Sequence, residues 1–205
     1  MKKALLLVDL IKGFGQEGYD KNMYCQNVEK IKKNIQQLVE YANKNNMPVI
    51  YCCDAHQSND PELKNNGGPW EEHCMKDTKS SEIVDWLPLR GLVKLTNADS
   101  NRKINDKKGN SNIFRIDKRT YSGFYNTALD NLLKYNGINE VYIAGLVTSI
   151  CVQHTAADAF FRGYKVNIVE NGCADTSDEK HENAIAYMKN NYSARTVRMD
   201  KNRLQ

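Results

Sequence analysis

The sequence predicts an α/β fold: a doubly wound parallel sheet flanked by helices on both faces. Short apolar runs rich in Leu, Ile and Val recur along the chain, as in strands that are buried on both faces. Amphipathic helical segments alternate with those runs, which is typical of right-handed crossovers in a parallel sheet. With 205 residues, 40% of them hydrophobic, the chain is expected to form a single domain over residues 1–205.

In the first half, strands are expected over residues 4–10 and 49–53, with a helix over residues 25–45 between them. The helix is indicated by an apolar stripe at helical spacing, Val28, Ile31, Ile35, Leu38 and Val39. Residues 57–112 are rich in loop signals, and loops this long in a compact domain tend to be functional. We expect the first part of this stretch to build a site, and the polar tract 97–112 to be a solvent-exposed excursion.

In the second half, strands are expected over residues 113–117, 141–146, 165–169 and 194–199. A helix over residues 127–135 should end at Asn136 and Gly137, a good C-cap pair. Another helix is expected to begin with Ser149 as its N-cap, so that Cys151 lies in its first turn. A last helix, from Ser177 or Asp178 to about Met188, precedes the final strand.

Composition argues against several classes of function. The net charge of +4 is spread along the chain, so nucleic-acid binding is not expected. An apolar run of membrane-spanning length is absent, and MKKALLLVDL has too short an apolar stretch for a signal peptide. The six cysteines show no CxxC spacing and are interpreted as reduced thiols in a cytoplasmic protein, not as a disulfide framework.

Three residues with complementary chemistry follow separate predicted strands: Asp9, Lys118 and Cys151. The carboxyl ends of strands in a doubly wound sheet converge on one crevice, so these side chains are expected to meet. A lysine cation and a helix N-terminus both favour a thiolate, and a carboxylate can carry its proton to a leaving amine. A buried structural cysteine is the alternative for Cys151 taken alone.

A second group, Asp54, His56 and His73, has the donor types of a catalytic divalent-metal site. Residues two apart in an extended segment point the same way, so Asp54 and His56 share one side, and His73 could return from the following loop. Glu62 or Asp60 could add an oxygen ligand. Structural hydrogen bonding is the alternative for this weak motif.

The chain resembles the isochorismatase-like cysteine hydrolases over nearly its whole length, and most closely their nicotinamidase branch. The resemblance rests on LLLVDL, IDKRTYSGF and GLVTSICVQHTAADAFFRGY. It implies a three-layer, Rossmann-like fold and a catalytic triad of Asp9, Lys118 and Cys151. It also implies a cis peptide bond between Leu146 and Val147, which would place the N–H groups of Val147 and Cys151 in an oxyanion hole.

Within the nicotinamidase branch, DAH and WEEHC match the metal-ligand pattern. The resemblance therefore implies that Asp54, His56 and His73 bind a metal ion, with Glu62 as a fourth candidate, and that the metal holds the pyridine nitrogen of the substrate. Zn²⁺ is the expected ion, although Fe²⁺ and Mn²⁺ suit the same donors. Three aromatic residues, Phe14, Trp70 and Tyr121, match positions that line the substrate pocket.

The sequence departs from the family pattern at three places. Ser149 replaces a common Asp, Glu71 and Glu72 replace prolines before His73, and the tract 97–112 has no counterpart. The predicted function is hydrolysis of nicotinamide to nicotinate and ammonia, as in NAD salvage. The alternatives are an amidase for another carboxamide or N-carbamoyl compound, an isochorismatase, and a non-catalytic binding protein. The sequence is compatible with a homo-oligomer without specifying one.

Overall fold

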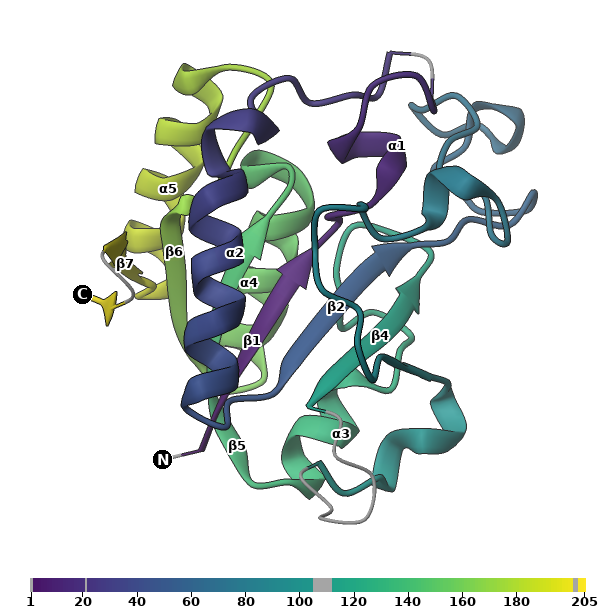
Figure 1. Ribbon diagram of the computed structural model, residues 1–205. Helices are drawn as coiled ribbons and strands as arrows, with labels where there is room; N and C mark the ends of the chain where they lie inside the picture. The colour runs from purple at the N-terminus through teal and green to yellow at the C-terminus, as the bar shows by residue number, and fades with distance from the viewer. Residues whose placement is uncertain (1, 21, 105–111, 201–202) are drawn as a thin grey trace.

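A parallel seven-stranded sheet forms the centre of the computed structural model, which describes residues 2–20, 22–104, 112–200 and 203–205 (Figure 1). The strand order is β3-β4-β2-β1-β5-β6-β7, so the chain winds outward from β1 in both directions. The strands are β1 (Lys2–Val8), β2 (Val49–Asp54), β3 (Val93–Leu95), β4 (Ile113–Lys118), β5 (Ile138–Gly145), β6 (Lys165–Cys173) and β7 (Arg195–Val197). The predicted doubly wound parallel sheet is confirmed.

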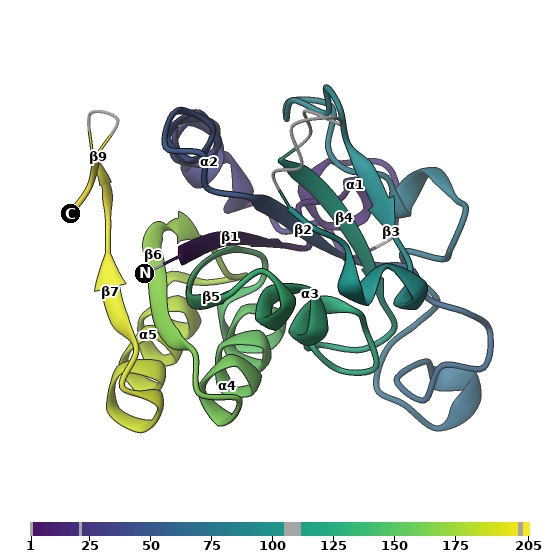
Figure 2. The same ribbon diagram turned by 90° about the horizontal axis from the view of Figure 1, so that it is seen from below.

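Helices cover both faces of this sheet. Seen along the strands, α2 lies on one face, and α3, α4 and α5 lie on the other (Figure 2). The helices are α1 (Lys12–Gly15), α2 (Val28–Lys44), α3 (Leu129–Tyr135), α4 (Gln153–Phe161) and α5 (Asp178–Tyr192). The predicted apolar stripe of α2 is buried against the sheet, which explains why this helix forms there.

Two helix ends agree with the capping signals in the sequence. The Ser177 side chain accepts a hydrogen bond from the Lys180 N–H at the start of α5. At the end of α3, Asn136 is the C-cap and Gly137 takes the left-handed conformation, with φ of 66°. Other ends moved: α2 begins at Val28 rather than at residue 25, and β6 continues to Cys173.

The loop-rich stretch contains short ordered elements that were not predicted. They are η1 (Lys64–Asn66), η2 (Lys79–Ser81), β3 and η3 (Asn97–Asn101). Near the C-terminus, β8 (Met199–Asp200) and β9 (Arg203–Leu204) form an antiparallel pair outside the main sheet. Strand β3 has only three residues, too few for a periodic signal, and its identity depends on pairing with β4.

The polar tract is only partly the exposed excursion that was expected. Asn97, Ala98, Arg102 and Lys103 are exposed, but Ile104 is buried and its N–H donates to the Asn136 side chain at 2.8 Å. The tract therefore begins as a segment anchored on α3. Residues 105–111 of the prediction lie outside the described residues.

The core is centred on β1, where Leu5, Leu6 and Leu7 have no solvent exposure. Consecutive buried residues on one strand require cover on both faces, which the two helix layers supply. Among the described residues, no helix combines the length and the apolar character needed to cross a membrane.

Candidate active site

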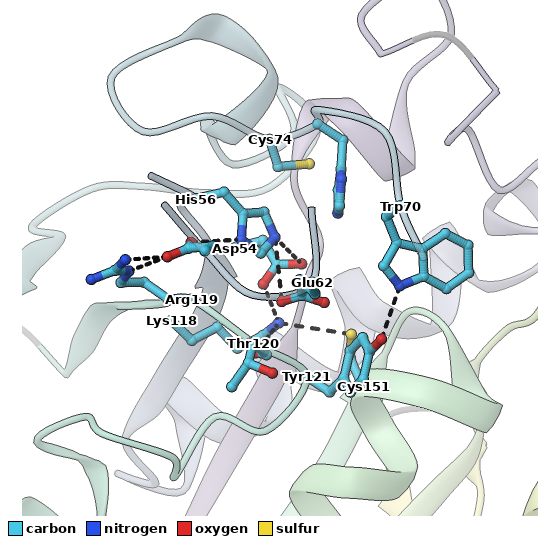
Figure 3. Close-up of polar contacts among 12 residues, drawn as sticks. Asp54, His56, Glu62, Trp70, Cys74, Lys118, Arg119, Thr120, Tyr121 and Cys151 are labelled. Atoms are coloured by element: carbon cyan, nitrogen blue, oxygen red, sulfur yellow. Dashed lines mark hydrogen bonds and ion pairs between the residues drawn. The ribbon is translucent and has the colours of Figure 1, made fainter. Parts of the chain in front are cut away.

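The sheet register brings the three predicted catalytic side chains together at the carboxyl ends of β1, β4 and β5. Lys118 Nζ lies 2.8 Å from Asp9 Oδ2 and 3.7 Å from Cys151 Sγ. All three side chains are buried, and Lys118 extends toward Cys151 in Figure 3. The three side chains therefore meet at the strand ends, as the sequence predicted.

Asp9 is held in place by β2 as well as by Lys118. Its N–H donates to Cys52 O at 2.9 Å, and its Oδ1 accepts the Asp54 N–H at 2.8 Å. Asp9 also has φ of 51°, a left-handed conformation that is rare for residues other than glycine. Such backbone strain is typical of functional sites, where the surrounding contacts hold it.

The turn that carries Cys151 differs from the predicted helix start. After β5 the chain forms η4 (Thr148–Val152), a π-helical turn with Val147 as its N-cap, which leads into α4. Ser149 is therefore inside the helical turn and is not its cap. The Ser149 N–H donates to the Asp175 side chain at 2.7 Å. A contact between residues 26 positions apart gives no local sequence signal.

The expected cis peptide bond between Leu146 and Val147 is wrong for this structure, whose described residues contain no cis peptide bond. Backbone hydrogen bonds fix the chain on both sides of this bond: the Leu146 N–H donates to Val8 O, and the Thr148 N–H donates to Ala174 O, each at 2.9 Å. Val147 still lines the cavity beside Cys151.

Burial controls the ionisation of the three catalytic candidates. It raises the pKa of the Cys151 thiol well above the usual value; Lys118 opposes this rise, and the Asp9 charge adds to it. Burial and the Asp54 charge raise the pKa of Asp9 to about 6, against the lowering effect of Lys118. The free site thus favours a thiol beside a carboxylate, rather than the thiolate expected from the helix end and the lysine.

Lys118 keeps its charge although it has no access to solvent. Burial alone would lower its pKa, but Asp54 and Asp9 outweigh that effect and raise it well above the usual value. The Lys118 Nζ also contacts Asp54 Oδ1 at 2.5 Å. In the β2–β4 register, Asp54 pairs directly with Lys118, so one carboxylate joins the catalytic group to the predicted metal group.

The predicted metal ligands Asp54, His56 and His73 form a compact buried cluster, whose ligand atoms lie within 4.8 Å of one another. His56 Nδ1 contacts Asp60 Oδ2 at 3.0 Å, and His73 Nδ1 contacts Glu71 O at 2.7 Å. Because acceptors occupy both Nδ1 positions, each ring is left with Nε2 as a ligand atom. His73 is distant from Asp54 and His56 in the sequence, and the loop after β2 brings it back to them.

The unsatisfied atoms of this cluster fit a cation. His56 Nε2 and Glu62 Oε1 are buried without a hydrogen-bond partner and lie 3.8 Å apart. Burial would lower the pKa of His56, but Asp54, Asp60 and Glu62 raise it to about 9, which is the effect of a strongly negative environment. Glu62 faces the cluster, whereas Asp60 is engaged by His56, Arg119 and the Gln57 N–H, so the geometry favours Glu62 as the additional ligand.

A cavity of about 120 Å³ opens over these groups. Its wall is largely apolar and aromatic and contains the three predicted residues: Phe14, Trp70 and Tyr121, together with Met23, Val147 and Ile150. Trp70 Nε1 donates to the Tyr121 hydroxyl at 2.9 Å, which fixes two of the rings relative to each other (Figure 3). Asp9, Asp54, Glu62, His73 and Cys151 supply the polar part of the lining.

Four lining residues were not predicted from the sequence: Asn22, Met23, Ile150 and Thr176. Thr176 follows the end of β6 by three residues, so the rule that ligand sites lie at strand ends could have found it. Asn22 and Met23 come from a loop without a motif and gave no such signal. Of the remaining histidines, His154 is exposed, and His181 Nδ1 contacts Thr148 Oγ1 at 2.9 Å.

Comparison with known proteins agrees with this fold. The family model described as the isochorismatase domain matches residues 3–91 and 98–199. The chain belongs to the isochorismatase family of hydrolases.

Solved structures of amidases are similar to it over nearly the whole chain. N-carbamoylsarcosine amidase from Thermoplasma acidophilum has a TM-score of 0.78 and 31% identity, covering 98% of each chain. The pyrazinamidase of Pyrococcus horikoshii in complex with zinc has a TM-score of 0.78 and 25% identity, covering 97% of this chain and 99% of that one. Nicotinamidase PncA from Bacillus subtilis has a TM-score of 0.77 and 29% identity, covering 95% and 98%.

Proposed function

We propose that the protein hydrolyses nicotinamide to nicotinate and ammonia through a thioester on Cys151, the reaction that serves NAD salvage. The observation that carries this proposal is a small aromatic-walled cavity with no lysine or arginine among its described lining residues. Cys151, Asp9 and the metal-binding cluster lie together at its base. A neutral, flat carboxamide matches such a cavity in shape and charge.

The charge of the lining is the basis for choosing among the family's substrates. N-carbamoylsarcosine and isochorismate both carry carboxylates, which need a cationic or hydrogen-bonding partner when they are buried. The described lining instead contains the carboxylates Asp9, Asp54 and Glu62, and the nearby Lys118 is already paired with the first two. Nicotinamide avoids this repulsion because it has no charge, and its ring nitrogen would take the position on the proposed metal ion that a substrate carboxylate could otherwise use.

In the proposed reaction, Asp9 accepts the proton of the Cys151 thiol as the sulfur bonds to the carboxamide carbon. Asp9 passes the proton to the amide nitrogen, and ammonia leaves as the C–N bond breaks. Water then attacks the thioester, Asp9 takes its proton and returns it to the sulfur, and nicotinate is released. Lys118 compensates the negative charge at each stage. The Val147 and Cys151 N–H groups are proposed to stabilise the oxyanion because both residues line the cavity, although the Leu146–Val147 bond is trans.

Asp54, His56 and His73 are proposed to hold a divalent metal ion, with Glu62 as the fourth candidate. A bound ion would supply a Lewis acid for the ring nitrogen of the substrate. We propose Zn²⁺ because imidazole and carboxylate donors suit it and a similar pyrazinamidase was solved with zinc, although Fe²⁺ and Mn²⁺ suit these donors too.

Ammonia release from nicotinamide by the zinc-loaded protein tests this function. We expect turnover by the wild type, loss of turnover in Cys151→Ala, and retained turnover in Cys173→Ala, which removes a buried cysteine outside the cavity lining. N-carbamoylsarcosine should be a much poorer substrate. Faster hydrolysis of that compound than of nicotinamide would refute the substrate assignment, and undiminished activity of Cys151→Ala would refute the mechanism.

A further inference from the structure

A buried carboxylate outside the proposed catalytic group joins the turn of the nucleophile to the wall of the cavity. Asp175, only 2% exposed, lies just after β6. Its Oδ2 accepts the Ser149 N–H at 2.7 Å, and its Oδ1 accepts the Thr176 N–H at 2.8 Å. Ser149 is two residues before Cys151, and Thr176 lines the cavity.

Ser149 N–H is one of the groups at the start of η4 that need an acceptor from outside the helix. An ionised carboxylate makes stronger hydrogen bonds to such groups than a neutral acceptor does. In this chain the carboxylate reaches the turn from just beyond the end of the neighbouring strand. The start of the nucleophile turn is thereby fixed relative to β6.

Two further contacts hold the same turn against the segment after β6. The Thr148 N–H donates to Ala174 O at 2.9 Å, and Thr148 Oγ1 contacts His181 Nδ1 at 2.9 Å. Asp175 is itself fixed from the opposite side, because Asn27 Nδ2 donates to its backbone oxygen at 2.8 Å. The carboxylate therefore cannot easily follow the turn if the turn shifts.

We propose that Asp175 is a positioning residue, which holds the Cys151 turn so that Sγ stays aimed at the substrate carbon and close to Asp9. This role rests on the proposed function of Cys151 as the nucleophile. An asparagine at position 175 would keep the size of the side chain but offer one acceptor oxygen in place of two. Either the Ser149 or the Thr176 N–H would then face an amide NH₂ group and lose its hydrogen bond.

The test compares Asp175→Asn with Asp178→Asn, the same change at an exposed carboxylate three residues later that binds Lys30 at 2.7 Å. We expect Asp175→Asn to lower kcat for nicotinamide by about 10- to 100-fold, because displacement of a reacting group by about 1 Å has effects of this size. KM should change little, and Asp178→Asn should match the wild type.

Alkylation of Cys151 by iodoacetamide, followed by mass spectrometry of the peptide, gives a readout that needs no substrate. The loosened turn should make the buried sulfur more accessible, so alkylation of Asp175→Asn should be faster while turnover is slower. If the wild type fails to hydrolyse nicotinamide, the proposed function fails, and the alkylation rates still test Asp175.

Thermal unfolding of each variant separates positioning from folding. A folded Asp175→Asn protein with unchanged kcat and unchanged alkylation would overturn the proposal. An Asp175→Asn protein that is unfolded at 25 °C would also overturn it, because the carboxylate would then act on stability alone.

Discussion

Replacing Asp60 by asparagine should weaken metal binding without touching a proposed ligand. Asp60 has no solvent exposure, and its Oδ2 accepts both the Gln57 N–H at 2.9 Å and His56 Nδ1 at 3.0 Å. Its Oδ1 accepts Arg119 Nε at 2.5 Å. All of these partners are donors, so an asparagine must turn its NH₂ group toward at least one of them.

The expected magnitude follows from the loss of the charged partner of His56. The carboxylate fixes the ring with Nε2 directed inward and raises the basicity of the histidine as a ligand. Removing such a partner typically costs about 10- to 100-fold in metal affinity, or about 1.4–2.8 kcal/mol. The buried N–H donor that then faces the NH₂ group of the asparagine loses its hydrogen bond, which adds to this loss.

The dissociation constant for Zn²⁺, measured by competition with a chelator, gives the direct readout. Asp117→Asn is the control, because Asp117 is likewise ion-paired, with Arg115 and Lys94, but is only half-buried and is not among the metal-cluster residues. We expect weaker zinc binding in Asp60→Asn only, with activity recovered at high zinc. Equal zinc affinity in Asp60→Asn and the wild type would refute the proposed role of Asp60.

Three further substitutions have defined outcomes. Lys118→Met should abolish ammonia release and lower the free energy of unfolding by about 3–5 kcal/mol, because it leaves two buried carboxylates without their cation. Trp70→Phe removes the hydrogen bond to Tyr121 and should raise KM several-fold with a smaller effect on kcat. Gly145→Ala should destabilise the fold by about 1–3 kcal/mol or more, since φ is +127° and a Cβ would lie 2.0 Å from Val8 O.

Chemical denaturation measures the two stability effects, and steady-state kinetics measures the others. Full activity of Lys118→Met would contradict the proposed charge balance. An unchanged KM in Trp70→Phe would contradict a role of the Trp70 indole in substrate binding. A fully stable Gly145→Ala protein would contradict the close approach of β1 and β5.

Local patterns in the sequence were sufficient for much of the fold. The apolar runs that became β1, β2 and β5 are continuous because both faces of the sheet are covered, and the stripe of α2 is periodic because one side faces that sheet. Strand β3 was missed because it has three residues. The start of η4 was misplaced because Val147 is its N-cap and the acceptor of the Ser149 N–H, Asp175, comes from a distant segment.

For the site, the sequence by itself placed Asp9, Lys118 and Cys151 at strand ends, and the geometry of parallel sheets required those ends to converge. Tertiary structure decided what no local pattern encodes. Burial of the Cys151 thiol raises its pKa. Asp60 is hydrogen-bonded to Arg119 and His56, whereas Glu62 Oε1 has no hydrogen-bond partner and faces the metal cluster. The tertiary structure also keeps the Leu146–Val147 bond trans. Residue type and spacing carry local chemistry, whereas burial and hydrogen-bond partners depend on segments that meet only after folding.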